Sequence, residues 1–189
     1  MFQGRKIAVF DAEIKKPIED CSRGWKSHDE MGVSCLVVFD YETMRYRVFD
    51  DHNMNECLNI LYGHDVVVGF NTVGFDWKLI NATYNNNQER RSRDFDILRE
   101  IWISIGADPD HFRPETHGGY KLDDVARETI GLMKSGDGAK APRLYQQGKI
   151  AELIDYCVQD VKIEKELFEF VAHFGYVLRN GRKIRIKFQ

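Results

Sequence analysis

Apolar and polar residues alternate along the chain in blocks, and the first three apolar blocks have the length and character of β-strands. Residues 7–11 form a short apolar run, and Val33–Asp40 contains the nearly continuous run VSCLVVF that is typical of a central strand. Arg45–Phe49 follows after a link at residues 40–44 that is short enough for a β-hairpin. The sequence therefore predicts three antiparallel strands at the start of the chain.

The middle of the chain alternates helical patterns with short buried strands. Asn53 is positioned to cap the first helix, and the second helix begins after Asn71 or within residues 74–76 and ends near residue 82. Strands that alternate with helices in this way are typical of a sheet with parallel strands. The expected strands cover residues 65–70 and 93–96, and the other expected helices cover residues 53–62, 97–105, 122–130 and 149–174.

Two features mark the last third of the chain. Residues 134–142 are rich in glycine and end in Pro142, which predicts a mobile loop. Near the end of the chain, an Asn-Gly pair at residues 180–181 separates two segments of alternating apolar and basic residues, which predicts a β-hairpin. We therefore expect one α/β domain at residues 1–175, with a mixed sheet flanked by helices. A basic C-terminal hairpin at residues 176–189 is expected to pack on the same domain.

Size and composition narrow the class of protein. A chain of 189 residues with 43% apolar residues is long enough to bury a core and is most simply one globular domain. It contains no apolar run of about 18 residues, so we expect no membrane-spanning helix and no membrane partner. The cysteines are scattered without a C-x-x-C pair, which argues against structural zinc and a disulfide framework and favours a reducing cytoplasm. They are Cys21, Cys35, Cys57 and Cys157.

The net charge of −3 does not mark a nucleic-acid binder, but the charge is unevenly distributed. The end of the chain is an acid-free basic tail. It either contacts phosphates or forms a solubilising edge hairpin whose charges prevent pairing with other sheets. The basic residues of this tail are Arg179, Arg182, Lys183, Arg185 and Lys187.

Four carboxylates stand where the expected elements would bring them together. Asp11 and Glu13 lie two residues apart at the end of the first strand, so both side chains point to the same side. Asp76 follows the fourth strand, and Asp160 shares one face of the long helix with Tyr156, four residues earlier. Two divalent cations about 4 Å apart repel each other unless concentrated negative charge holds them, and hard oxygen ligands suit Mg²⁺ and Mn²⁺. The four acids therefore indicate a two-metal phosphodiesterase.

At the residue level, three segments resemble the exonuclease motifs of the DEDD superfamily, which includes the proofreading domains of DNA polymerases. They are FDAE at residues 10–13, GFNTVGFD at residues 69–76 and YCVQD at residues 156–160. The tyrosine four residues before the last aspartate marks the tyrosine branch, DEDDy. The resemblance runs from residue 7 to about residue 174 and implies a ribonuclease H-like fold. The stretch MGVSCLVVFD, the segment KSGDGAKAPRLYQQGKIAEL and the basic end also resemble standalone or helicase-fused bacterial and phage members.

This resemblance implies a metal-dependent 3′→5′ exonuclease that releases nucleoside monophosphates from single-stranded ends of DNA or RNA. Its cofactors would be two divalent cations, Mg²⁺ or Mn²⁺. Asp11 would bridge both cations, Glu13 would bind the one nearer the nucleophile, and Asp76 would reach the second partly through water. Asp160 completes the set of metal ligands. A helicase or another repair or processing protein is a candidate partner in trans, because a chain of this size has no room for a polymerase domain.

The resemblance also assigns residues to the substrate and to the attacking water. Asn71 and Phe75 would shape the substrate pocket, together with Ala12 and Ile14 in the first motif. That motif usually reads D-x-E-T, and Ile14 replaces a threonine that lies near the terminal nucleotide in the relatives. An unperturbed tyrosine has a pKa of about 10 and is a poor base at neutral pH. We therefore assign Tyr156 to orienting the attacking water and leave the deprotonation of that water to the metal.

Other interpretations stay open at the level of the sequence. The same metals would support a structure-specific endonuclease, and a rival from another class is a catalytically inactive nucleic-acid-binding module. The presence of all four acids argues against a pure binding module, which has no need to crowd like charges together. Asp96 is either a helix cap, which is favoured, or a support for the ligands. Trp25 and His28 either lie at the surface, which is favoured, or stack on a base.

Overall fold

A mixed β-sheet forms the centre of the computed structural model, which describes residues 4–86, 93–133 and 139–188. The strands are β1 (Ile7–Ile14), β2 (Val33–Asp40), β3 (Arg45–Phe49), β4 (Val66–Gly69), β5 (Arg93–Asp96), β6 (Tyr176–Arg179) and β7 (Arg182–Arg185). Within the described residues, one sheet has the strand order β3-β2-β1-β4-β5, and β6 and β7 form a separate hairpin. Strands β1, β2 and β3 are antiparallel, whereas β4 and β5 join β1 in parallel. The predicted sheet of antiparallel strands followed by parallel strands is therefore confirmed.

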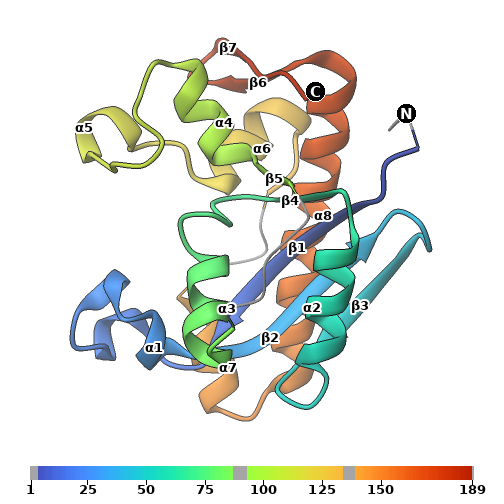
Figure 1. Ribbon diagram of the computed structural model, residues 1–189. Helices are drawn as coiled ribbons and strands as arrows, with labels where there is room; N and C mark the ends of the chain where they lie inside the picture. The colour runs from blue at the N-terminus through green and yellow to red at the C-terminus, as the bar shows by residue number, and fades with distance from the viewer. Residues whose placement is uncertain (1–3, 87–92, 134–138, 189) are drawn as a thin grey trace.

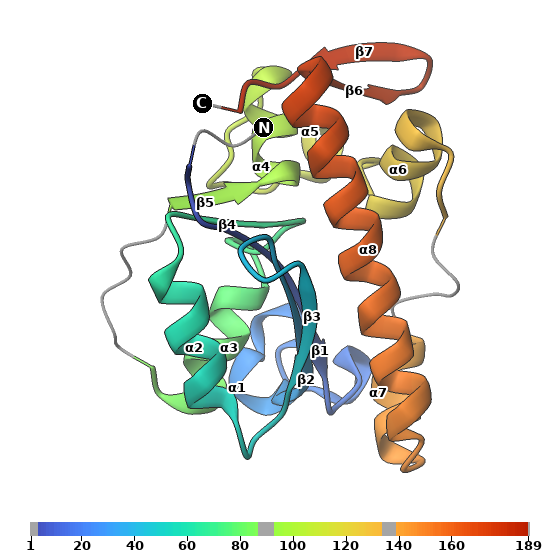
Figure 2. The ribbon, with the colours of Figure 1, turned by 90° about the vertical axis from the view of Figure 1, so that its right-hand side faces the viewer.

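Helices cover both faces of this sheet. They are α1 (His28–Met31), α2 (Met54–Gly63), α3 (Asp76–Tyr84), α4 (Ile97–Ser104), α5 (Pro114–His117), α6 (Leu122–Ile130), α7 (Lys140–Gln146) and α8 (Ile150–Phe174), with 3₁₀ turns η1 (Ile18–Asp20) and η2 (Gly24–Lys26). Helices α2 and α3 lie on one face, and α8 crosses the other face with α6 and α7 beside it (Figures 1 and 2). The helices expected at residues 53–62, 97–105, 122–130 and 149–174 are confirmed with small shifts at their ends.

Strand β1 is buried on both faces and directs its side chains alternately into two cores. Ile7 and Val9 pack in the core beneath α8, whereas Phe10 packs in the core beneath α2 and α3. Because successive side chains on a strand point to opposite faces, Asp11 and Glu13 continue the series that faces α8. The sequence pattern of β1 therefore places both carboxylates on the α8 side of the sheet.

Strand β1 continues beyond its predicted end at residue 11 and reaches Ile14. Its pairing with β2 shifts register between Glu13 and Ile14, which marks a β-bulge. Ala12 and Ile14 are buried in the core beneath α2 and α3, so the strand continues although two acids interrupt its apolar run. The bulge ends the regular pairing directly beside the second carboxylate.

The structure corrects part of the loop predicted at residues 134–142. Helix α7 begins at Lys140, so the end of the predicted loop is helical, while residues 134–138 lie outside the described residues. Pro142 lies in the first turn of α7, where its missing N–H breaks no helical hydrogen bond. Leu144 is buried in the core that also contains α8. Burial of this apolar side chain explains why a segment rich in glycine and proline ends in a helix.

The hairpin of β6 and β7 follows α8 directly and packs against α6 (Figure 2). Asn180 and Gly181 at its tip have positive φ values of 52° and 68°, as a tight two-residue hairpin turn requires. The hydroxyl of Thr129 on α6 accepts a hydrogen bond from the backbone N–H of Leu178 at 2.9 Å. Val177 of β6 packs in the same core as α8. The hairpin therefore shares a hydrophobic core with the rest of the described chain.

No helix among the described residues combines the length and the apolar character that a membrane crossing requires. Helix α8 has 25 residues but carries charged side chains along its whole length. The four cysteines are buried and free, so no disulfide links the elements of the fold.

Candidate active site

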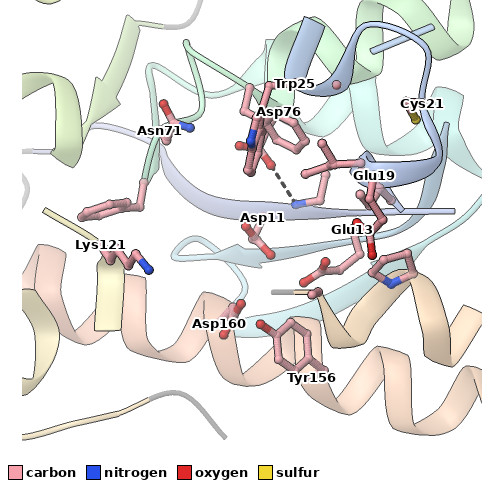
Figure 3. A pocket seen from close by; sticks show the side chains of 18 residues that line it. Asp11, Glu13, Glu19, Cys21, Trp25, Asn71, Asp76, Lys121, Tyr156 and Asp160 are labelled. Atoms are coloured by element: carbon pink, nitrogen blue, oxygen red, sulfur yellow. Dashed lines mark hydrogen bonds between the residues drawn. The ribbon is translucent and has the colours of Figure 1, made fainter. Parts of the chain in front are cut away.

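A cleft with a volume of about 790 Å³ opens at the carboxyl ends of β1 and β4 (Figure 3). Its wall combines side chains from β1, from the segment between β4 and α3, and from the middle of α8. The nine residues that the sequence assigned to metals, catalysis or substrate all line this cleft: Asp11, Ala12, Glu13, Ile14, Asn71, Phe75, Asp76, Tyr156 and Asp160. Three distant parts of the chain therefore meet at one place.

Asp11 and Glu13 form the centre of the acidic wall. A carboxylate oxygen of each residue and the Sγ atom of Cys157 all lie within 4.8 Å of one another. The fully buried thiol of Cys157 donates to the backbone oxygen of Asp11 at 3.5 Å and lies 3.7 Å from its Oδ2. Burial, followed by contact with Cys35 and the charge of Asp11, raises the pKa of the Cys157 thiol. The Cys157 thiol therefore stays protonated and neutral, and in this form it supports Asp11.

Asp76 is the first residue of α3 and enters the cleft from the side of β1 opposite Asp11 and Glu13. Its Oδ1 accepts a hydrogen bond from the backbone N–H of Ala12 at 3.1 Å (Figure 3), and the residue is only 3% exposed. Burial, followed by the negative charge of Asp11, raises the pKa of Asp76 well above its ordinary value. Crowding of carboxylates in the cleft therefore disfavours the charged form of Asp76.

Tyr156 and Asp160 lie one turn apart on α8, and both point into the cleft toward Asp11 (Figure 3). Their exposed fractions are 3% and 2%, so the surrounding protein restricts both side chains. Leu153 and Val161 on the same helix are fully buried against the sheet. Packing of α8 on the sheet therefore holds its two polar residues opposite the carboxylates of β1.

Asp96 holds the loop that leads from β4 to α3. Its buried carboxylate accepts four backbone hydrogen bonds, from Asn71 (2.8 Å), Val73 (3.0 Å), Leu98 (3.1 Å) and Arg99 (3.2 Å). The first two bonds position the loop that carries Asn71 to the cleft, and the other two cap α4. Burial raises the pKa of Asp96, against the opposing effect of these four donors. Asp96 is therefore both the helix cap and a support for the cleft.

Replacement of Asp96 by asparagine should lower the free energy of unfolding by about 2 kcal/mol. An amide group in place of one carboxylate oxygen cannot accept the bonds of that oxygen, so at least one buried N–H loses its acceptor. Urea denaturation measures the change, with Asp155→Asn at an exposed position of α8 as the matched control. Equal stability of Asp96→Asn and the wild type would contradict the role of Asp96.

Asn71 and Phe75 lie at the two ends of a tight turn before α3. Asn71 has a φ of 69°, in the left-handed region that asparagine tolerates better than most residues. A Cβ added to Gly74 would stand 2.3 Å from Oδ1 of Asn71, so a side chain at this position would displace the Asn71 side chain. The ring of Phe75 contacts Trp25 edge-on at 5.7 Å and His28 at 5.5 Å. Trp25 is 66% exposed and lines the cleft, so it is a surface residue that also belongs to the cleft wall.

Comparison with protein-family models matches residues 25–172 to the RNase H superfamily. The chain belongs to the RNase H superfamily. A search of curated proteins finds no match. Among solved structures, a similar one is the family B DNA polymerase from the hyperthermophilic archaeon Pyrobaculum calidifontis, with a TM-score of 0.62 and 20% sequence identity. The aligned region covers 88% of this chain and 24% of the polymerase, and a likeness at this identity shows the fold alone.

The cleft of this RNase H superfamily member has the charge that a divalent-cation site requires. Nucleases with this fold generally use divalent metals. Among the residues that the structure describes, the charged side chains that line the cleft are five acids and one lysine: Asp11, Glu13, Glu19, Asp76, Asp160 and Lys121. Burial and the negative charge of Asp11 raise the pKa of Asp76, as expected where carboxylates lie close together. Carboxylate oxygens suit hard cations such as Mg²⁺ and Mn²⁺, so the residues present fit these ions.

Other residues of the cleft wall in this RNase H superfamily member were not predicted from the sequence. These residues come mainly from the segment after β1 and from the starts of α6 and α7: Ile18, Glu19, Cys21, Gly24, Phe70, Lys121, Ala139 and Pro142. Lys121 occupies the N-cap position of α6 and reaches into the cleft from the side opposite Glu19 (Figure 3). A lone lysine before a helix carries no recognisable functional pattern, so only the fold reveals its position.

Proposed function

We propose that this chain is a 3′→5′ exonuclease that hydrolyses phosphodiester bonds at single-stranded nucleic-acid ends with two divalent cations, Mg²⁺ or Mn²⁺. The observation that carries the proposal is the convergence of four carboxylates and one tyrosine from three distant segments in one cleft. Membership of the RNase H superfamily supports nuclease chemistry in general. The 3′→5′ direction rests on the resemblance of the three motifs to exonucleases of the tyrosine branch.

The carboxylates of Asp11, Glu13, Asp76 and Asp160 would hold the cations. When bound, divalent cations polarise the phosphodiester group and lower the pKa of the attacking water. The protein contributes a concentration of negative charge on buried or partly buried side chains, held by the sheet and α8. Without cations this charge would repel the anionic substrate, so binding of metal and binding of substrate are coupled.

Tyr156 and the uncharged residues of the cleft would position the reacting groups. The Tyr156 side chain points into the cleft one turn before Asp160 (Figure 3). In this position it would orient the attacking water. Asn71, Phe75 and Ala12 would contact the terminal nucleotide. Ile14 offers an apolar surface that is 7% exposed, so contact with the substrate at this position is apolar.

The proposal extends to the protein that supplies the substrate and to the cellular compartment. A helicase or another processing protein is the candidate partner that would supply the single-stranded end in trans. Four buried free thiols are compatible with a reducing cytoplasm.

End-labelled oligonucleotides distinguish the proposed exonuclease from its two alternatives. Single-stranded DNA and RNA labelled at the 5′ end, incubated with Mn²⁺ or Mg²⁺, should give ladders that shorten stepwise from the 3′ end. A structure-specific endonuclease would instead cut a circular strand, which has no end. A binding module would retard the oligonucleotide on a gel without shortening it. Either of the last two results would overturn the proposal.

Mn²⁺ should raise the midpoint of thermal unfolding, and the increase should grow as pH rises through the raised pKa of Asp76. The pKa of Asp76 is raised in the metal-free protein, so the stability from this group is present at low pH and lost as pH rises through the raised pKa. Asp76 would have to lose its proton to hold a cation, so cation binding should tighten as pH rises.

The matched variant Asp76→Asn should raise the midpoint of the metal-free protein at pH values above the raised pKa of Asp76, where it removes one of the crowded charges. The same variant should lose most of the increase with Mn²⁺. Scanning fluorimetry measures both values across the pH range. An identical increase with Mn²⁺ in the wild type and in Asp76→Asn would show that Asp76 is not a ligand.

A further inference from the structure

A second cleft, of about 780 Å³, lies between the end of α4 and the hairpin of β6 and β7. Its charged lining residues are all basic: Arg179, Arg182, Lys183 and Arg185. The other residues of its wall are uncharged: Ser104, Ile105, Tyr120, Asn180 and Ile184. This basic cleft is therefore opposite in charge to the acidic cleft that holds Asp11 and Asp160.

The arginines of the basic cleft fall into two groups. Arg179 is an anchor, since its side chain is 13% exposed and pairs with Asp124 and Glu128 on α6. Arg182 and Arg185 are exposed, and neither forms an ion pair with an acid in the described part of the chain. The anchor fixes the hairpin on α6, and the other two guanidinium groups are available to an anionic ligand.

Consecutive residues join the two clefts. Tyr120 lines the basic cleft, and Lys121 lines the acidic cleft. The Nε atom of Arg179 donates to the backbone oxygen of Gly119 at 2.5 Å, which ties this connecting segment to the hairpin. A ligand that leaves the acidic cleft past Lys121 therefore arrives beside the arginines.

Helix α8 gives a measure of how far the hairpin lies from Asp160 in the acidic cleft. Asp160 lies in its middle, and the hairpin begins just after Phe174 at its end (Figure 2). At about 1.5 Å per residue, the helix from Asp160 to Phe174 spans about 20 Å. A ligand that reaches from Asp160 to the hairpin must therefore be a polymer several units long.

We propose that the basic cleft binds the phosphodiester backbone of the strand whose end lies in the acidic cleft. This inference rests on the proposed function, because it places another part of the same substrate. Guanidinium groups bind phosphate oxygens through paired, charge-assisted hydrogen bonds. Within the described parts of the chain, Lys121 is the one basic residue that lines the acidic cleft, so the arginines of the basic cleft add attraction for a long strand.

The double variant Arg182→Gln/Arg185→Gln tests this assignment, with its thermal midpoint as the check on folding. Fluorescence anisotropy in Mg²⁺ would compare a single-stranded oligodeoxynucleotide of about 15 nucleotides with a trinucleotide across a salt series, both with phosphorothioate linkages that resist hydrolysis. Affinity for the long strand should fall about 10-fold at 0.1 M salt, with a salt dependence less steep by about 0.7 for each lost phosphate contact. Affinity for the trinucleotide, which is too short to occupy both clefts, should not change.

The control Arg45→Gln/Lys162→Gln removes the same charge from two exposed positions on β3 and α8. It should leave the salt dependence of the long strand unchanged. An equal change in both double variants, or no change in either, would overturn the proposal. The proposal would also be overturned if Arg182 and Arg185 bound polyglutamate in the basic cleft while their replacement left oligonucleotide binding unchanged.

The two proposals can fail separately. A changed salt dependence without any cleavage ladder would leave the basic cleft as a strand-binding site and remove the nuclease proposal. A normal cleavage ladder, together with an unchanged salt dependence in Arg182→Gln/Arg185→Gln, would support the nuclease proposal and overturn the proposal that the basic cleft binds the strand.

Discussion

Asp11→Asn should lower nuclease turnover by about 1,000-fold or more, which corresponds to about 4 kcal/mol of transition-state stabilisation. The Asp11 carboxylate is central to the acidic wall, since it lies beside Glu13 and Cys157 and raises the pKa of Asp76. Asparagine keeps the shape of the side chain and the backbone oxygen to which Cys157 donates. The substitution therefore removes charge with little change in packing. Single-turnover kinetics on a labelled oligonucleotide measures the loss.

The control for this result is Asp155→Asn, the same chemical change at an exposed position of α8. Its turnover should stay within about twofold of the wild type. The thermal midpoint of metal-free Asp11→Asn should match or exceed that of the wild type, because the repulsion on Asp76 falls. Near-normal turnover in a well-folded Asp11→Asn protein would refute the two-cation assignment.

Tyr156→Phe should lower turnover by about 10- to 1,000-fold and leave cation binding largely intact. The residue is 3% exposed, and its ring packs in the core beneath α8. Phenylalanine keeps this packing and removes only the hydroxyl that would orient the attacking water. The fall should therefore appear in kcat, with little change in KM.

Asp160→Asn on the same helix face provides the comparison for Tyr156→Phe. It should lose turnover together with the increase in thermal midpoint that Mn²⁺ causes in the wild type. Tyr156→Phe should lose turnover alone. If both variants lost the Mn²⁺ effect equally, Tyr156 would be needed for cation binding, and its assigned role would be wrong.

Elements with a strong and regular pattern were predictable from the sequence. Strands β2 and β4 are buried on both faces, so each appears as a continuous apolar run. Helix α8 has apolar residues at helical spacing over its whole length. Helices α1 and α5 have four residues each, too few to show a period, and were therefore not predicted.

The position of the cleft was predictable, but its supports were not. The carboxyl ends of parallel strands lie at one edge of a sheet, so residues after β1 and β4 were expected to meet there. The four hydrogen bonds that the Asp96 carboxylate accepts depend on the relative positions of β5 and the loop around Asn71, and tertiary packing sets these positions. Local patterns contain no signal for Lys121 either, because its place in the cleft depends on how α6 packs.

The exposed indole of Trp25 makes the cleft optically distinct from the rest of the molecule. The other two tryptophans, Trp77 and Trp102, are 4% and 8% exposed, whereas Trp25 is 66% exposed. A water-soluble quencher such as acrylamide therefore reaches one emitter far more readily than the other two. The intrinsic fluorescence of the unlabelled protein thus serves as a reporter of whether anything covers the rim of the cleft.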